Sequence, residues 1–389
     1  MEPLISIIIP IFNAEETIIP TIENILNQTY SNYEILIIDD ASTDKGAKKV
    51  TTYTKKYQNI KLISTNGEGF THALNIGQKA SKGKYVIFFK TGNLMSQNFL
   101  EYIVELSQKY NSDITTCDYF EITELEFFNT NYKIPYMPKE NINIFTPKNY
   151  IRKLSSCKKH KFEKTYMLWN KLINKKILNN ISFPSKKFCP DESLILDIIN
   201  NSNKIVSSNQ LLLINTLINE YYIERCFTYT SIEKVEFLQK LLLMFKQQKD
   251  TNAIKNTCIN FINTLCDIRK TLIFYYLDIY DLEVQKNIID LKFNSIYKFL
   301  NNTMPSIANS QKYKKYFKRY KKIVYIDNFR EKNCALYPQP QKYKGYYPEL
   351  FIDSKVDIFL KEQGKKQKIP KSNPNFRNMY HPRNNARRI

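Results

Sequence analysis

The chain has 389 residues, which is long enough for two domains with separate cores. Its hydrophobic content of 43% argues against wholesale disorder. No apolar run approaches the ~18 residues of a membrane-spanning helix, and Met1-Glu2-Pro3 leads into a strand-like segment instead of a basic signal peptide, so we expect a cytoplasmic protein. The seven cysteines include no C-x-x-C pair, which argues against a disulfide framework or a zinc site.

The formal net charge of +21 is concentrated in the later part of the chain. Residues 1–120 hold 13 acidic and 11 basic side chains, against 24 and 47 in the remainder. A basic surface of this kind suits anionic lipid headgroups, phosphorylated polymers or nucleic acid. Nucleic acid is the least favoured, because no known recognition motif accompanies the charge.

The first 40 residues predict a strand, a helix and a second strand. Ile5–Ile9 is a β-branched run closed by Pro10, and Ile35–Ile38 is a second such run that ends in Asp39-Asp40. Between them, apolar residues recur at helical spacing at Ile18, Ile22, Ile25 and Leu26. This order is typical of a βαβ crossover with buried parallel strands.

The alternation continues to about residue 117. The expected elements are strands at Ile60–Ile63, Tyr85–Phe89 and Asp113–Cys117, and helices at His72–Ala80 and Asn98–Tyr110. Together they predict an α/β, doubly wound sheet. Ligands of such sheets lie beyond the carboxyl ends of the strands, which here carry Asp39-Asp40, Ser64–Gly69 and Lys90–Asn93.

A helical second domain is expected to begin near Thr230, where Thr230-Ser231-Ile232-Glu233 has the spacing of a capping box. A single apolar helix face follows at Ile254, Cys258, Phe261, Leu265, Ile268 and Leu272. Residues 364–389 contain eight Lys or Arg and no acids, which predicts a flexible basic tail.

Several short segments of the first 220 residues recur together in one protein family. They are Pro10-Ile11-Phe12-Asn13-Ala14-Glu15, Leu26-Asn27-Gln28-Thr29-Tyr30, Asp39–Asp44, Asn66-Gly67, Ala73-Leu74-Asn75-Ile76-Gly77, Ala80–Tyr85, Trp169-Asn170-Lys171-Leu172 and Ile181-Ser182-Phe183-Pro184. At these intervals the sequence resembles the family-2 glycosyltransferases of the GT-A fold, over roughly residues 4–220.

The resemblance implies that a nucleotide-diphosphate sugar, with uracil as the favoured base, binds at the strand ends. It implies that Asp40 accepts a hydrogen bond from the base and that Asp39 supports the same loop. Such a buried pairing also rejects analogues that lack the donor. The resemblance also implies that Pro10, Phe12 and Glu15 line the base pocket. Further predicted donor-binding residues are Asn13, Asn75 and Lys90.

The family places an Asp-x-Asp-Asp element after the strand predicted at Tyr85–Phe89, where it holds Mn²⁺ or Mg²⁺ against the diphosphate. Here the element reads Lys90-Thr91-Gly92-Asn93, which has no carboxylate ligand, so we predict no metal residues. Either the Lys90 ammonium replaces the metal charge, or Lys90 is an exposed loop lysine in a domain that has lost catalysis.

Direct displacement with inversion needs a general base for the acceptor hydroxyl, and Asp191 and Glu192 are the candidates. The family usually shows Glu-Asp here, so the order is reversed and either acid could be the base. The alternative is that two acids opening an apolar helix stabilise its N-terminus and have no other role.

Residues 312–322 contain seven Lys or Arg and no acids, and their aromatic residues fall on one helix face. This basic helix either lies on an anionic membrane or docks on the second domain with a solvated lysine face, and docking is the favoured interpretation.

The sequence thus predicts a GT-A domain at 1–222, a helical domain at 223–330 and a C-terminal extension at 331–389. The favoured function is sugar transfer to a glycan, lipid-linked or protein acceptor, with peripheral contact to an anionic membrane as a further expectation. The alternative is a non-catalytic binding or scaffold protein that keeps the glycosyltransferase fold.

Overall fold

The computed structural model describes residues 2–123, 127–128, 139–155, 165–183, 190–217, 221–274, 282–303 and 305–332. The chain divides into two compact units, Met1–Glu220 and Tyr221–Ile389. The boundary expected after residue 222 lies close to this division. The expected basic tail lies outside the described residues.

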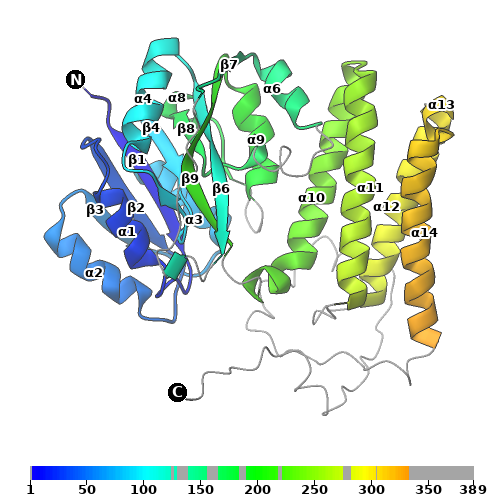
Figure 1. Ribbon diagram of the computed structural model, residues 1–389. Coiled ribbons are helices and arrows are strands. Elements are labelled where there is room, and N and C mark those ends of the chain that lie inside the picture. The colour runs from blue at the N-terminus through cyan, green and yellow to red at the C-terminus, as the bar shows by residue number, and fades with distance from the viewer. Residues whose placement is uncertain are drawn as a thin grey trace. The chain divides into compact units, whose positions relative to one another are not determined.

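Strands and helices alternate along most of the first unit (Figure 1). Its elements are β1 (Ile5–Ile11), α1 (Ile18–Leu26), β2 (Tyr33–Asp39), α2 (Gly46–Lys56), β3 (Ile60–Ser64), α3 (Phe70–Ala80), β4 (Tyr85–Phe88), β5 (Leu94–Met95), α4 (Phe99–Tyr110), β6 (Ile114–Thr123), β7 (Ile142–Phe145), α6 (Pro147–Lys153), β8 (Lys171–Asn174), α8 (Lys175–Leu178), α9 (Pro190–Asn200) and β9 (Ile205–Leu217).

Within the described residues, nine strands form one sheet in the order β3-β2-β1-β4-β8-β6-β9-β5, with β7 paired to β9. The strands β3, β2, β1 and β4 are parallel, as predicted. The short strand β8 is antiparallel to both β4 and β6, and β6 is parallel to β9. The α/β fold class is confirmed, but the second half of the sheet is mixed.

Helices cover both faces of the parallel half of the sheet. On one face, alternate residues of β1 such as Ile7 and Ile9 share a buried cluster with Ile22 of α1 and Ile103 of α4. On the other face α3 approaches the sheet closely, because a Cβ built on Gly77 would lie 2.3 Å from Ile8 Cγ2. Burial on both faces explains why these strands read as continuous apolar runs in the sequence.

The described part of the second unit is helical and consists of α10 (Tyr221–Gln247), α11 (Thr251–Phe274), α12 (Leu282–Thr303), α13 (Pro305–Ala308) and α14 (Gln311–Lys332). Five of the six residues of the predicted apolar face of α11 are buried: Ile254, Cys258, Phe261, Leu265 and Ile268. The side chain of Leu272 lies outside the described part. No helix among the described residues is long and apolar enough to cross a membrane.

The predicted start of this helical region was wrong. Thr230 lies inside α10, which begins at Tyr221, so the capping-box spacing at Thr230–Glu233 does not mark a helix end. A capping-box spacing alone therefore does not fix where a helix begins.

Candidate functional site

The carboxyl ends of four parallel strands form one edge of the sheet (Figure 1). Strand register aligns Ile11 with Asp39, and Asp39 with Ser64, so β1, β2 and β3 end level with one another. The end of β4 leads into Lys90 at the same edge, because β4 is parallel to β1. The structure therefore brings the predicted strand-end residues together.

Asp40 links the segments at this edge. Asp40 is only 8% exposed. Its carboxylate accepts hydrogen bonds from the Thr65 hydroxyl at 2.6 Å and from the Gly69 N–H at 2.9 Å. Its own N–H donates to the carbonyl of Ile11 at 2.9 Å. A carboxylate has about four acceptor positions, so Asp40 keeps capacity for a further donor. The sequence did not identify Thr65 as its partner.

Asp39 stabilises the same region from the neighbouring position. Its buried carboxylate accepts from the Ser42 N–H at 3.2 Å, and its carbonyl accepts from the Thr65 N–H at 2.8 Å. The N-terminus of α2 is instead contacted by Asp44, which accepts from the Gly46 N–H at 2.9 Å. Asp39 and Asp40 thus bind loops and do not cap the following helix.

Asn13 holds the loop after β2 from the side of β1. It adopts a left-handed backbone conformation with φ 49°. Its side-chain oxygen accepts from the Thr43 N–H at 2.8 Å, and its own N–H donates to the Ser42 hydroxyl at 3.0 Å. Short polar side chains tolerate this backbone region, which suits asparagine at the position.

Glu15 contacts the same loop further along. Its carboxylate accepts from the Lys45 N–H at 3.2 Å and pairs with the Lys49 ammonium at 3.1 Å. These two groups, the Lys45 hydrogen bond first, lower the pKa of Glu15 below its usual value. Asn13 and Glu15 therefore position the loop that follows Asp40, and their direct contact with a donor stays a prediction.

Two aromatic side chains accompany the polar groups of this edge. Pro10 is buried within β1, whereas Phe12, just after β1, is partly exposed. Phe70 opens α3 directly after Gly69 and is 40% exposed. The exposed Phe70 ring beside Gly69 is a feature that apolar periodicity does not predict, although the sequence places Phe70 directly after Gly67-Glu68-Gly69.

The Asn75 side chain is hydrogen-bonded within the domain. Its side-chain amide donates to the Phe183 carbonyl and accepts from the Phe183 N–H, both at 2.8 Å. The Phe183 ring packs edge-on against Phe88 of β4, with ring centroids 5.2 Å apart. Asn75 thus fixes the segment that precedes the two candidate acids, and donor contact by Asn75 stays a prediction.

Residues Lys90–Asn93 form a tight turn after β4. The Asn93 N–H donates to the Lys90 carbonyl at 3.2 Å, and Gly92 has φ 82°, which favours glycine at this position. The Gly92 N–H donates to the Thr21 hydroxyl at 3.0 Å, and its carbonyl accepts from the Thr216 hydroxyl. The turn is therefore held from α1 and from β9, with the Lys90 residue exposed.

This turn does not fit a divalent metal. It offers no carboxylate ligand, and its one side-chain amide, that of Asn93, is 0% exposed. Among the residues that the structure describes, no group of three His, Cys, Asp or Glu side chains could hold a metal ion. Hard divalent cations in proteins prefer several oxygen ligands that include carboxylates.

The candidate bases Asp191 and Glu192 lie in the first turn of α9, which begins at Pro190. Their side chains lie outside the described part of the chain, so their role stays a prediction. The apolar face of the helix is buried through Leu194, Ile195 and Ile198. The helix is thus anchored on the domain core beyond its first turn.

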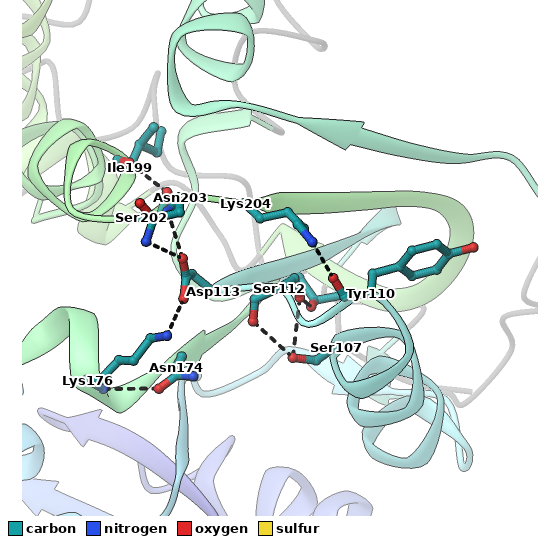
Figure 2. A network of polar contacts seen from close by, with 11 residues as sticks. Ser107, Tyr110, Ser112, Asp113, Asn174, Lys176, Ile199, Ser202, Asn203 and Lys204 are labelled. Atoms are coloured by element: carbon teal, nitrogen blue, oxygen red, sulfur yellow. Dashed lines mark hydrogen bonds and ion pairs between the residues drawn. The ribbon is translucent and has the colours of Figure 1, made fainter.

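A polar network fixes the other end of α9 (Figure 2). The buried Asp113 carboxylate accepts from the Asn203 N–H at 2.7 Å and pairs with the Lys176 ammonium at 2.9 Å. Ser202 donates to the Ile199 carbonyl at 2.7 Å. Burial alone would raise the pKa of Asp113, but the Asn203 and Lys176 contacts outweigh it, and the pKa is lowered.

Lys171 is a buried ionisable residue in the segment Trp169-Asn170-Lys171-Leu172. It is 0% exposed, and its ammonium donates to the Asn170 side-chain oxygen at 2.7 Å and to the Met167 carbonyl. Its register partner is Thr116 of β6. A buried cation costs free energy unless it is hydrogen-bonded, which explains the two acceptors.

Comparisons with known proteins agree with this arrangement. The family model "Glycosyl transferase family 2" matches residues 6–189. The chain is 23% identical over 303 residues to the glycosyltransferase GlyG of Streptococcus pneumoniae, covering 74% of this chain and 94% of GlyG. It is 31% identical over 121 residues to the uncharacterized glycosyltransferase EpsJ of Bacillus subtilis, covering 31% of this chain but only 35% of EpsJ.

A solved structure of S. aureus TarS 1–349 in complex with UDP-GlcNAc is also similar, with 18% identity, a TM-score of 0.46, and coverage of 68% of this chain and 80% of that one. The family match spans the parallel strands and the loops that hold Asp39, Asp40 and the Lys90 turn. Residues 6–189 therefore form a glycosyl transferase family 2 domain.

Proposed function

We propose that the protein transfers a sugar from a UDP-sugar to an acceptor hydroxyl with inversion at the anomeric carbon. The observation that supports binding of the donor's nucleobase is the buried Asp40 carboxylate. Thr65 and Gly69 orient this carboxylate at the carboxyl ends of the parallel strands. Uracil presents an imide N–H that a carboxylate can accept. Guanine and cytosine also carry N–H donors, so uracil is chosen by the family resemblance and the titration below compares the three bases.

In the proposed reaction, Asp191 or Glu192 takes the proton of the acceptor hydroxyl while its oxygen forms a bond to the anomeric carbon. The bond from that carbon to the diphosphate breaks, and UDP leaves with the electron pair. The Lys90 ammonium, at the end of β4, stabilises the negative charge that develops on the diphosphate.

The acceptor class is a hydroxyl of a glycan, of a lipid-linked saccharide or of a protein. We place the reaction in the cytoplasm, where nucleotide sugars are the substrates of this class of enzyme. A lipid-linked acceptor requires the enzyme to reach a membrane surface, and peripheral contact with anionic lipid is part of the proposal. The basic surplus of residues 121–389 supports that contact.

The test is calorimetric titration of the full-length protein with UDP, GDP and CDP, each with Mn²⁺ and with a chelator. UDP should bind most tightly, with or without the metal, and Asp40→Asn should weaken UDP binding by about tenfold or more, since a hydrogen bond to a charged group contributes about 1.5–3 kcal/mol. Glu68→Gln, at an exposed site on the neighbouring loop, is the control. Equal binding of UDP by Asp40→Asn and the wild type would contradict the assignment.

A further inference from the structure

Helix α14 carries a lysine face that the proposed reaction does not use. The helix packs on the rest of the second unit through Tyr313, Phe317 and Tyr320, all of which are buried. Tyr320 stacks on Phe293 of α12 with ring centroids 3.8 Å apart, and Arg319 contacts Asn263 of α11 at 3.2 Å. The expectation that this helix docks on the second domain is thus confirmed.

The opposite side of α14 is exposed and uniformly basic. It carries Lys314, Lys315, Lys318, Lys321 and Lys322, all exposed, which we call the lysine face. At 3.6 residues per turn these five positions span an arc of about 120°. No acidic residue occurs between Gln311 and Tyr325. Among the described residues, none of the five ammonium groups forms an ion pair with a carboxylate.

Tyr325 lies near the middle of the same arc and is 70% exposed. A tyrosine has an apolar ring and a polar tip, a combination enriched at the boundary between lipid headgroups and acyl chains. The row from Lys314 to Tyr325 is about 16 Å long at 1.5 Å per residue. The six side chains lie on one side of a single helix, so a flat surface can contact all of them at once.

We propose that the lysine face of α14, together with Tyr325, is the surface by which the protein binds an anionic lipid bilayer. This refines the peripheral membrane contact of the proposed function, but it does not depend on the donor chemistry. Anionic lipid complements a face with five exposed cations and no acid. A single-stranded nucleic acid would call for a groove with stacking aromatics, whereas this face offers one tyrosine on a convex helix.

The experiment is co-sedimentation of the full-length protein with vesicles of phosphatidylcholine alone or mixed with phosphatidylglycerol. We expect binding only to the mixed vesicles, decreasing with added salt because the charges are exposed and screened. The test variant combines Lys314→Gln, Lys318→Gln and Lys321→Gln. Each lysine near an anionic surface contributes about a fivefold factor in binding, so the triple variant should bind roughly a hundredfold more weakly.

The matched control combines Lys48→Gln, Lys55→Gln and Lys79→Gln, three exposed lysines of the first unit, which changes the net charge equally. It should bind mixed vesicles nearly as well as the wild type. Tyr325→Ala should weaken binding without changing its salt dependence, and Tyr325→Trp should restore it. The proposal is overturned if the triple variant binds like the wild type, or if both triple variants lose binding equally.

Two further measurements separate lipid binding by this face from a loss of folding and from binding of nucleic acid. The triple variant should keep the wild-type thermal midpoint and the wild-type stabilisation by UDP, because the substituted side chains are exposed and lie outside the donor-binding unit. A wild type that does not bind UDP would reject the proposed donor and leave the vesicle result standing. Equal binding of a single-stranded oligonucleotide, lost in the same triple variant, would overturn the assignment to lipid.

Discussion

Lys90 stands at the position where the family resemblance places the first carboxylate of a metal-binding element. The turn that bears it is held by Thr21 and Thr216 through the backbone of Gly92, so its position is fixed independently of any ligand. If the Lys90 ammonium stabilises the leaving diphosphate, Lys90→Ala should lower kcat by about a hundredfold or more. This is the usual effect of removing one group that stabilises charge in the transition state.

The measurement is the rate of UDP release in the presence of acceptor, with and without a chelator. The control is Lys82→Ala, an exposed lysine in the turn before β4. Inhibition of the wild type by the chelator would reveal metal ligands elsewhere and contradict the role given to Lys90. Full activity of Lys90→Ala would leave Lys90 as a surface lysine.

Glu34 is a buried carboxylate on β2. It accepts from the Ser6 hydroxyl at 2.7 Å, from the Lys82 N–H at 2.6 Å and from the Lys61 ammonium at 3.2 Å. Burial raises its pKa, but these three contacts outweigh the effect, and the pKa lies below its ordinary value of 4.5. The stabilisation is therefore present at neutral pH and is lost as the pH falls below about 4.5 through the folded-state pKa.

Glu34→Gln should lower the free energy of unfolding at pH 7 by about 2 kcal/mol, because charge-assisted hydrogen bonds are lost. The difference from the wild type should shrink as the pH falls below 4.5, where the wild-type carboxylate becomes protonated. Urea unfolding at several pH values measures both effects, with the exposed Glu68→Gln as control. A difference that is independent of pH would contradict the lowered pKa.

At the scale of elements, α3 is pressed against the sheet at Gly77. A Cβ at this position would lie 2.3 Å from Ile8 Cγ2 and 3.3 Å from Ile38 Cγ1, so the helix or the strand must shift to accept it. Gly77→Ala should destabilise the protein by about 1–3 kcal/mol, as overpacked cores do, despite the better helix propensity of alanine.

Chemical denaturation measures this cost, and Ile8→Leu, which removes the obstructing branched methyl group, should relieve part of it in the double variant. Because α3 also carries Asn75, the shift should reach the segment at Phe183, and kcat should fall with the stability. Equal stability of Gly77→Ala and the wild type would contradict the close approach of α3 to β1.

The regular elements of the parallel half were predictable, and others were not. Apolar runs and helical spacing located β1, α1, β2 and α4 to within a residue or two. They did not locate α2, in which only Gly46 and Val50 are buried, or β8, which has four residues and begins with the buried Lys171. Periodicity needs several turns or several alternating residues, and both elements are too short or too polar to provide it.

At the scale of the molecule, the sheet and all predicted donor-binding residues belong to the unit Met1–Glu220. A fragment of residues 1–220 should therefore fold and keep the UDP-dependent thermal stabilisation of the full chain, while losing the binding to anionic vesicles. Thermal shift with UDP and vesicle co-sedimentation of the same fragment measure the two properties. A fragment that stays folded but no longer responds to UDP would show that the second unit contributes to the donor site.

The sequence by itself determined the α/β class, the parallel strands and the edge at which Asp39, Asp40 and Lys90 meet, because strand-end residues follow directly from apolar runs and their spacing. It also determined the basic surplus and the absence of carboxylates at Lys90–Asn93. Only the tertiary structure decided that Asp40 binds Thr65 and Gly69, that Asn75 holds Phe183, and that the lysine face of α14 is exposed. Each of these depends on which loops and helices meet in space, and residues 25 to 108 positions apart leave no mark in local periodicity.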